Sequence, residues 1–477
     1  MKSRWFVGIW IGMLFAAMPA PAQDVSKVVG DWLGSLDVGS VKLRLVLHIT
    51  RGDDGALRAT MDSIDQNASG IPVDVVTFDG KTLHLELPGI QGTYDATLDD
   101  AAATLKGTWA QRGTQLPLDM ARTEDAASLV LKRPQEPKPP FPYDSRDVTF
   151  TNDYVTLAGT LTLPRSPGPH ATVVLISGSG PQNRDEAVMG HRPFLVLSDY
   201  LTRQGIAVLR YDDRGVAKST GSFETATSAD FASDAEAAVA YLKTLPEIDG
   251  QHIGLVGHSE GGIVAPMVAV RSKDVAFIVM MAGVGVPIDE LLRAQSRLLL
   301  KASGADDEYI ALQEALSTRL FAISKTEPDA NVREEKLRKA VDAFVAELPA
   351  EKQTMTTEEK ASLEGSIQMV NSPWMRYLLS YDPAATLRKV KVPVLAINGE
   401  LDLQVPPSQN LPAIQKALKE GGNKDVTATE LPKLNHLFQT ATTGAPSEYG
   451  TIEETLAPLA LKTISDWILA RTQRAKP

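Results

Sequence analysis

Apolar and polar side chains alternate along short segments between residues 24 and 131. In the clearest segment, residues 41–49, valine, leucine and isoleucine alternate with lysine, arginine and histidine over most positions. This period of two predicts strands with one buried face, and turn sequences such as Asp79-Gly80 separate them. About six or seven such strands fit a small all-β barrel or open sandwich. Such a module either packs against and shapes a neighbouring domain or binds a polymer or surface.

A proline-rich segment follows the alternating region. Its prolines, mixed with charged residues, are Pro134, Pro137, Pro139, Pro140 and Pro142. Proline at this density gives an extended, semi-rigid chain. We therefore expect a linker over residues 132–144 between an all-β domain at 24–131 and a second domain at 145–477.

From residue 145 onward, short apolar runs alternate with amphipathic segments. The runs predict strands near 148–151, 155–163, 171–176, 206–211, 253–256, 277–281, 392–398 and 426–431. Helical patterns between them, for example at residues 230–245, predict an α/β fold with a largely parallel sheet. Between 284 and 388 only helical patterns occur, which predicts a helical cap over the end of the sheet.

The residues Gly257-His258-Ser259-Glu260-Gly261 lie between the predicted strand 253–256 and a helix. Strand, G-x-S-x-G and helix is the context of a nucleophile elbow, in which a strained turn exposes the serine hydroxyl. We assign Ser259 as the nucleophile. The same pentapeptide also fits a plain glycine-rich turn, so the assignment depends on other segments.

The loop Ser177-Gly178-Ser179-Gly180-Pro181 follows the buried run 171–176. In hydrolases of this plan, a loop at that place gives one backbone N–H to the oxyanion hole, and the residue after the nucleophile gives the other. We assign these donors to the N–H groups of Ser179 and Glu260. A simple glycine-rich loop is the alternative.

A carboxylate and a histidine follow at the expected places. Asp402 lies on the loop after a late strand and is the predicted triad acid, with Glu400 of the same loop as the alternative. Of the seven histidines, His436 alone lies between the last predicted strand and the final helix, and His191 near the oxyanion loop is its rival. The order Ser259, Asp402, His436 is that of α/β-hydrolases.

Two other groups have both a functional and a structural interpretation. The turn Asp212-Asp213-Arg214-Gly215 carries charges that look catalytic, but we expect it to be a strand-end turn held by internal ion pairs. Several large side chains in the cap either line an apolar acyl pocket or form the cap's own core. They are Met355, Met369, Trp374, Met375 and Tyr377.

Composition narrows the function further. A chain of 477 residues is too long for one ordinary hydrophobic core. The formal net charge is -11 and no basic run stands out, which argues against nucleic-acid binding. The chain has no cysteine, so disulfides, thiolate metal sites and a cysteine nucleophile are excluded. We expect no metal and no organic cofactor.

The first residues have the pattern of a targeting segment. Lys2 and Arg4 precede an apolar stretch at residues 5–17, and Ala-Pro-Ala at 20–22 fits a cleavage site. We expect residues 1–22 to be a signal peptide of an exported protein, periplasmic or secreted, with no stable membrane span after cleavage. An uncleaved N-terminal anchor is the alternative.

Residues 145–477 resemble serine-dependent α/β-hydrolases of the esterase and serine-aminopeptidase-like type, which are related to prolyl-oligopeptidase catalytic domains. The segments that carry the resemblance are SGSGPQNRDE, RYDDRGVAKSTG, GHSEGG, PVLAINGELDLQVP and LNHLF. The β module and linker resemble the leader domain of periplasmic bacterial members. One departure is Ser177, which stands where many lipases have the histidine of HGG, so the loop differs from the strict lipase or carboxylesterase pattern.

The resemblance implies catalysis through an acyl-enzyme on Ser259. We expect hydrolysis of carboxylic esters with small or medium acyl groups. The alternative is a peptidase or aminopeptidase acting on short peptides or acylated amino acids, in which Glu260, Asp185 or Glu186 would bind an amine. An acyltransferase and a binding protein that has lost the chemistry are further alternatives.

Overall fold

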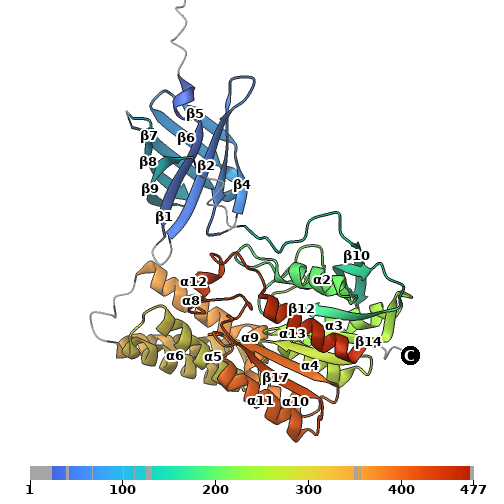
Figure 1. Ribbon diagram of the computed structural model, residues 1–477. Coiled ribbons are helices and arrows are strands. Elements are labelled where there is room, and N and C mark those ends of the chain that lie inside the picture. Colours follow the sequence, from blue (N-terminus) through green and yellow to red (C-terminus); the bar gives the residue numbers. More distant parts are fainter. Residues whose placement is uncertain are drawn as a thin grey trace, which may run out of the picture. The chain divides into compact units, whose positions relative to one another are not determined.

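A computed structural model describes residues 24–38, 42–66, 68–99, 101–111, 113–124, 132–348, 353 and 356–472. The expected signal peptide, residues 1–22, and Met355 lie outside the described residues. The chain divides into two compact units, residues 1–130 and 131–477 (Figure 1). Each unit has its own hydrophobic core and is described separately.

The first unit is an antiparallel sheet whose strand order is β4-β3-β2-β1-β9-β8-β7-β6-β5. The strands are β1 (Gly30–Asp37), β2 (Lys42–Arg51), β3 (Leu57–Ser63), β4 (Ala68–Val73), β5 (Val75–Phe78), β6 (Thr82–Leu87), β7 (Gly92–Leu98), β8 (Thr104–Gln111) and β9 (Thr114–Thr123). Its two ends approach each other, because β3 contacts β5 and β4 contacts β6. The predicted all-β, barrel-like unit is therefore present, and its described residues form nine strands instead of the expected six or seven.

Alternating apolar residues of these strands fill the interior of the first unit. Trp32 on β1 faces Leu47 on β2 across the sheet, and both are fully buried. The indole N–H of Trp32 donates to the carbonyl of Val28 at 2.9 Å. The strand count exceeded the expectation because β4, which contains glycine and proline, has no clear alternation in its sequence.

The second unit is built on an eight-stranded sheet of order β10-β11-β13-β12-β14-β15-β16-β17. The strands are β10 (Tyr143–Asn152), β11 (Val155–Pro164), β12 (His170–Ile176), β13 (Ala207–Tyr211), β14 (Ile248–His258), β15 (Phe277–Met281), β16 (Val394–Gly399) and β17 (Val426–Leu431). From β13 to β17 neighbouring strands are parallel, whereas β10 and β11 are antiparallel. The α/β fold class is confirmed.

Helices cover this sheet in two groups. One group is α3 (Ser228–Leu242), α4 (Gly261–Arg271), α10 (Pro383–Leu387) and α11 (Pro407–Glu420), and the other is α2 (Pro193–Arg203) with α13 (Pro458–Thr472). A short helix, α12 (Pro446–Tyr449), follows the loop that carries His436. The parallel strands β12, β14, β15 and β16 carry buried side chains on both faces, as expected for a sheet between helical layers.

Five of the helices described between β15 and β16 pack against one another (Figure 1). They are α5 (Ile288–Ala302), α6 (Asp307–Thr326), α7 (Ala330–Glu347), α8 (Thr357–Asn371) and α9 (Pro373–Ser380). The sequence pattern did not indicate α8, whose apolar residues are sparse. Nevertheless, a capping box of Thr356 and Glu359 starts it. In the described part of the chain, no helix combines the length and apolar character needed to cross a membrane.

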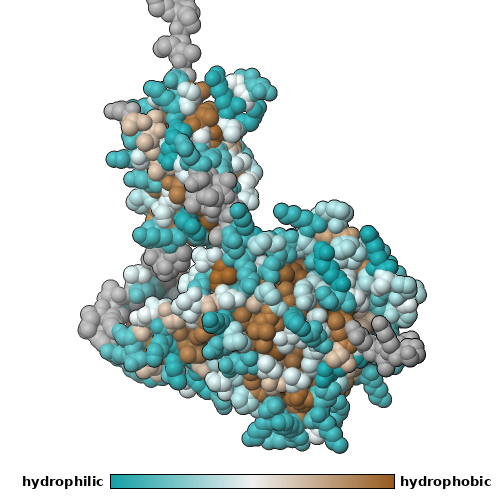
Figure 2. All heavy atoms as spheres, viewed as in Figure 1, coloured by the Kyte–Doolittle hydropathy of each residue, from teal (hydrophilic) through white to brown (hydrophobic). Residues whose placement is uncertain are grey.

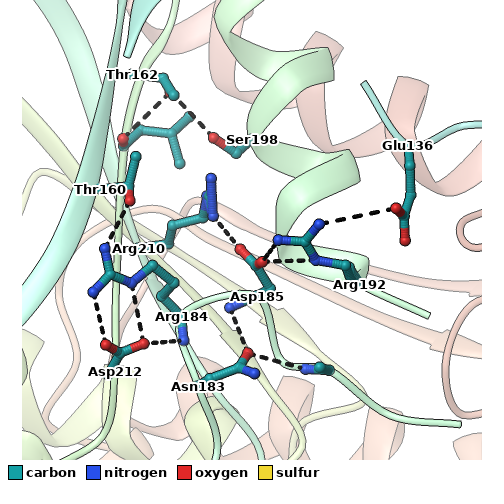
Figure 3. Close-up of polar contacts among 12 residues, drawn as sticks. Glu136, Thr160, Thr162, Asn183, Arg184, Asp185, Arg192, Ser198, Arg210 and Asp212 are labelled. Carbon is teal, nitrogen blue, oxygen red and sulfur yellow. Dashed lines mark hydrogen bonds and ion pairs between the residues drawn. The ribbon is translucent and has the colours of Figure 1, made fainter. Parts of the chain in front are cut away.

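Ion pairs anchor the loop between β12 and α2 to the strands beneath it (Figure 3). Arg184 binds both carboxylate oxygens of Asp212, at 3.1 and 2.7 Å, and Asp185 lies between Arg192 and Arg210. The expectation of ion pairs within the turn 212–215 was wrong. Asp212 pairs with Arg184 of the loop after β12, and Arg214 pairs with Asp234 of α3.

Candidate active site

A tight turn joins β14 to α4 and carries Ser259 at its centre. Ser259 has a φ of +52°, a conformation that L-residues seldom adopt. A Cβ on Gly257 would lie 2.0 Å from the carbonyl oxygen of Gly261, and one on Gly261 would lie 2.2 Å from that of Ile176. The Ser259 N–H donates to Met281 on β15 at 2.8 Å. The turn can form only with glycine at both positions, and it presents the serine at the carboxyl end of the sheet.

Asp402 and His436 are in direct contact. The Nδ1 of His436 lies 3.0 and 2.9 Å from the two carboxylate oxygens of Asp402, and both residues are buried. Asp402 also accepts the N–H groups of Gln404 and Val405 at 2.9 and 2.8 Å. These amides fix the carboxylate, so the imidazole is oriented with Nδ1–H toward Asp402 and with Nε2 on the edge of the ring away from that carboxylate.

The two alternatives named from the sequence lie elsewhere. Glu400 accepts the N–H of Lys433 at 2.8 Å instead of bonding to His436. His191 is held by Thr455 at 2.9 Å and by the carbonyl of Tyr449 at 2.8 Å. Burial lowers the pKa of His191 to about 4, so it is neutral and structural at ordinary pH.

Ser259 and His436 line one cavity of about 660 Å³. Ser179 and Glu260, the predicted oxyanion donors, line the same cavity. The loop amide before Ser179, that of Gly178, donates to Glu186 at 2.7 Å. Within the described residues, the N–H groups of Ser179 and Glu260 have no such acceptor, so both are available to a negative oxygen.

Apolar side chains from the helices between β15 and β16 form much of the cavity wall. They include Ile288, Leu291 and Leu292 of α5, Phe321 of α6, Met369 of α8, and Trp374, Met375 and Leu378 of α9. Of the pocket residues suggested by the sequence, Met369, Trp374 and Met375 line the cavity, whereas Tyr377 does not and stacks on Tyr381. The space beside Ser259 is therefore suited to an uncharged, apolar group.

A sequence model of the X-Pro dipeptidyl-peptidase (S15) family matches residues 121–431, more than half of the chain. The chain belongs to this family. The matched S15 range contains Ser259 and Asp402, and His436 lies just beyond it. The prediction of a serine hydrolase with an α/β-hydrolase fold of the peptidase and esterase type is confirmed.

Relatives of this S15 member include proteins named as esterases. Esterase EstD of Thermotoga maritima is 27% identical over 302 residues, which are 63% of this chain and 61% of that protein. The chain thus spans less than two thirds of this relative's length. Among solved structures, the Pyrococcus furiosus esterase Pf2001 is 18% identical. The match covers 70% of this chain and 92% of that chain, with a TM-score of 0.41. Est1E from Butyrivibrio proteoclasticus, bound to ferulic acid, matches with 16% identity, 68% and 98% coverage and a TM-score of 0.40.

The structure also shows a polar link that the sequence did not indicate. The Glu260 carboxylate accepts the Ser228 hydroxyl at 2.6 Å and the indole N–H of Trp374 at 2.9 and 3.0 Å. Burial raises the pKa of Glu260 despite these bonds. Trp374 was expected only as an apolar wall. Its contact with a residue over a hundred positions earlier leaves no local sequence signal.

A second contact that the sequence did not indicate involves His258, the residue before Ser259. Its ring bonds to Glu186 at 2.9 Å and to the carbonyl of His436 at 3.0 Å. The motif G-H-S-E-G placed His258 beside the nucleophile, but its partners come from two other loops. Only the folded structure brings them together.

Proposed function

We propose that the protein hydrolyses carboxylic esters through an acyl-enzyme on Ser259. In this mechanism the Nε2 of His436 removes the hydroxyl proton of Ser259 as its oxygen attacks the acyl carbonyl. Asp402 keeps the imidazole oriented and stabilises its protonated form. The N–H groups of Ser179 and Glu260 bind the oxyanion, and each such donor contributes on the order of 3 kcal/mol to transition-state stabilisation. His436 then protonates the leaving alcohol, and water releases the acid.

The observation that supports an ester over a peptide is the state of the carboxylates at the cavity. Glu186 and Glu260 are the acidic residues of its wall, and both are already bonded. Glu260 accepts from Ser228 and Trp374, and Glu186 accepts from Gly178 and His258. Asp185, the third candidate from the sequence, is paired with Arg192 and Arg210. An aminopeptidase needs a carboxylate that can bind a free ammonium group, and these three are engaged.

The size and lining of the cavity set the substrate class. A volume of about 660 Å³ lies in the usual range for small-molecule sites. Its wall is mainly aliphatic and aromatic, and no lysine or arginine of the described chain lines it. We therefore assign uncharged esters with small or medium acyl groups as substrates. Hydrolysis of short peptides is the second candidate, because the family bears a peptidase name.

A first experiment tests the nucleophile without a known substrate. Wild-type protein is treated with a fluorophosphonate, and the adduct is located by intact mass and peptide mapping. We expect one adduct at Ser259, its absence in Ser259→Ala and its loss in His436→Ala. An unlabelled wild type at several pH values would contradict the proposal and favour a binding protein.

A second experiment separates the substrate classes. p-Nitrophenyl esters of increasing acyl length are compared with X-Pro and aminoacyl anilides. We expect turnover of the esters, with the best kcat/KM at short or medium chains. Faster cleavage of the anilides would overturn the ester assignment, and product analysis with added alcohols would reveal acyl transfer.

We also propose that the protein is exported to the periplasm or secreted. The support is the sequence of residues 1–22, with two basic residues, an apolar stretch and Ala-Pro-Ala at 20–22. The N-terminal sequence of the protein recovered from fractionated cells tests this. A mature chain beginning at Gln23 in the exported fraction is expected, and an intact Met1 in the cytoplasmic fraction would contradict it.

A further inference from the structure

His258 forms a bridge from the nucleophile strand to the loop that carries His436. Its Nε2 lies 3.0 Å from the carbonyl oxygen of His436, and its Nδ1 lies 2.9 Å from Oε1 of Glu186. A carbonyl can only accept a hydrogen bond, so Nε2 carries hydrogen. The raised pKa of His258 beside Glu186 favours hydrogen on Nδ1 as well, so that an imidazolium is paired with the Glu186 carboxylate.

The surroundings of His258 fit this charge state. Both His258 and Glu186 are buried, at 6% and 4% exposure. Burial lowers the pKa of His258, the Glu186 carboxylate raises it, and the net result is a raised pKa. Other ionisable groups near His258 include His436, whose ring centroid lies 4.9 Å away, and Asp402. Asp213 interacts with Glu186. The His258 imidazolium and the Glu186 carboxylate together carry no net charge. The positive ring of His258 therefore lies beside His436 without adding net charge to the site.

The same oxygen of Glu186 reaches the oxyanion loop. Its Oε1 accepts the N–H of Gly178 at 2.7 Å. Gly178 lies close to the nucleophile, since a Cβ there would meet both Glu186 Oε1 and Ser259 Cβ at 3.3 Å. With the Gly178 N–H occupied, the next amide, that of Ser179, remains for the substrate. Glu186 thereby fixes which amide of the loop faces the reacting carbonyl.

The backbone around Glu186 is itself anchored. Glu186 has a φ of +51°, and its N–H donates to the carbonyl of Asn183 at 2.8 Å. Its neighbours Arg184 and Asp185 are tied by ion pairs to Asp212 and to Arg210 on the adjacent strand (Figure 3). The carboxylate is therefore presented from a fixed loop, and a change at residue 186 cannot easily be absorbed by backbone movement.

We propose that Glu186 and His258 are a positioning pair that holds the oxyanion loop and the His436 loop in register with Ser259. This inference rests on the proposed function of Ser259 as nucleophile. Oε1 of Glu186 bonds to the Gly178 N–H in the oxyanion loop and to the ring of His258, which bonds to the carbonyl of His436. The pair thereby positions both the oxyanion donors and the general base. Because misplacement of reacting groups by about 1 Å costs about 100-fold in rate, loss of the pair affects the chemical step more than substrate binding.

The test uses the full chain and the variant Glu186→Gln with a p-nitrophenyl ester. We expect kcat to fall by about 30- to 300-fold with KM within about threefold of wild type. Fluorophosphonate labelling should slow by a similar factor, because it uses the same base and oxyanion donors. Asp234→Asn is the matched control. It also breaks a buried ion pair, with Arg214 at 2.7 Å, but Asp234 does not line the cavity.

The control separates positioning from general destabilisation. Asp234→Asn should lower the melting temperature and leave kcat and the labelling rate near wild type. If Glu186→Gln retains wild-type kcat, or loses kcat only in proportion to a melting shift that Asp234→Asn reproduces, the positioning role is wrong. Should Glu186→Gln be insoluble, His258→Asn carries the same test because it breaks the same link.

A double-mutant cycle gives a second readout. If the two residues act as one unit, Glu186→Gln with His258→Asn should be little worse than the more damaging single variant. Additive losses would mean two unrelated roles and would overturn the pair. Wild type and Ser259→Ala run in parallel. If Ser259→Ala loses the ester reaction, the proposed function holds even when Glu186→Gln shows no effect. If wild type and Ser259→Ala turn over the ester equally, the proposed function itself is wrong.

Discussion

The carboxylate of Asp402 is the clearest single-residue test of the site. We expect Asp402→Asn to lower kcat by about 10³- to 10⁴-fold, because the amide stabilises the wrong tautomer of His436 and no longer balances its positive charge. Glu400→Gln is the matched control in the same loop, since the Glu400 carboxylate accepts the Lys433 N–H at 2.8 Å instead of bonding to His436. Steady-state kinetics on an ester, with circular dichroism to check folding, measures both. The reverse result, a damaging Glu400→Gln and a silent Asp402→Asn, would make Glu400 the triad acid.

Asp213 beneath the oxyanion loop gives a prediction in pH. Burial, together with Glu260 and Glu186 nearby, raises its pKa to about 8, against 3.8 for the ordinary group. Between these values the native state binds a proton that the unfolded chain does not, so this group's stability contribution falls as pH rises from about 4 to 8. The slope has an upper limit of about 1.4 kcal/mol per pH unit.

Asp213→Asn imitates the protonated form and removes that slope. Its free energy of unfolding relative to wild type should therefore rise between pH 6 and pH 8, by about 1–2 kcal/mol, and level off above pH 8. Urea unfolding at several pH values measures the difference. A difference that is independent of pH would mean that Asp213 is ionised throughout the range.

Sequence order predicts Ser259, Asp402 and His436 as one site, because each follows a recognisable strand and parallel strands bring their carboxyl ends to one edge. The structure brings Asp402 and His436 into contact and places Ser259 and His436 on one cavity. The roles of Glu186 and His258 could not be selected in this way. Both residues belong to segments that carry the family resemblance, but a charge pair between residues 186 and 258 depends on the side-chain packing of two loops. Local pattern therefore predicts candidate reacting groups, whereas the residues that hold them emerge only from the fold.

At the scale of elements, the elbow between β14 and α4 gives the sharpest prediction. Gly261→Ala should unfold the second unit or reduce its stability by more than about 3 kcal/mol, since the new Cβ would lie 2.2 Å from the backbone carbonyl of Ile176. Gly250→Ala is the control on the same strand, where the nearest atom is 3.8 Å away on the Lys243 side chain. Soluble yield and thermal melts compare the two. A stable, active Gly261→Ala would show that the turn relaxes freely.

Element prediction succeeded where burial on both faces gave unbroken apolar runs, as in β12, β15 and β16. It failed where the amino-acid pattern carried little contrast. Helix α8 contains three glutamates, two serines and one glycine, and its buried residues Ile367 and Val370 are too few to show a period. Strands β4 and β5 are short and lie only one residue apart, so no turn sequence separates them.

At the scale of the whole molecule, the apolar residues form two cores that share no member. One contains Trp32, Leu47 and their neighbours in the first unit, and the other contains Phe277, Ile278 and the rest of the second sheet. Since each contiguous core unfolds cooperatively, we expect two calorimetric transitions, one for each unit. The two separate cores are the support for the proposed division into an all-β domain and a catalytic domain.

Trp32→Ala tests that division. It removes a fully buried indole, its bond to Val28 and the surface on which Arg122 lies 4.3 Å from the ring centre, at a cost of about 3–5 kcal/mol. Only the transition of the first unit should move to lower temperature, and kcat on a small ester should stay within twofold of wild type. Phe277→Ala should move the other transition and lower activity with it. If Trp32→Ala shifts both transitions or reduces kcat, the first unit supports the catalytic fold directly, and its role would be structural.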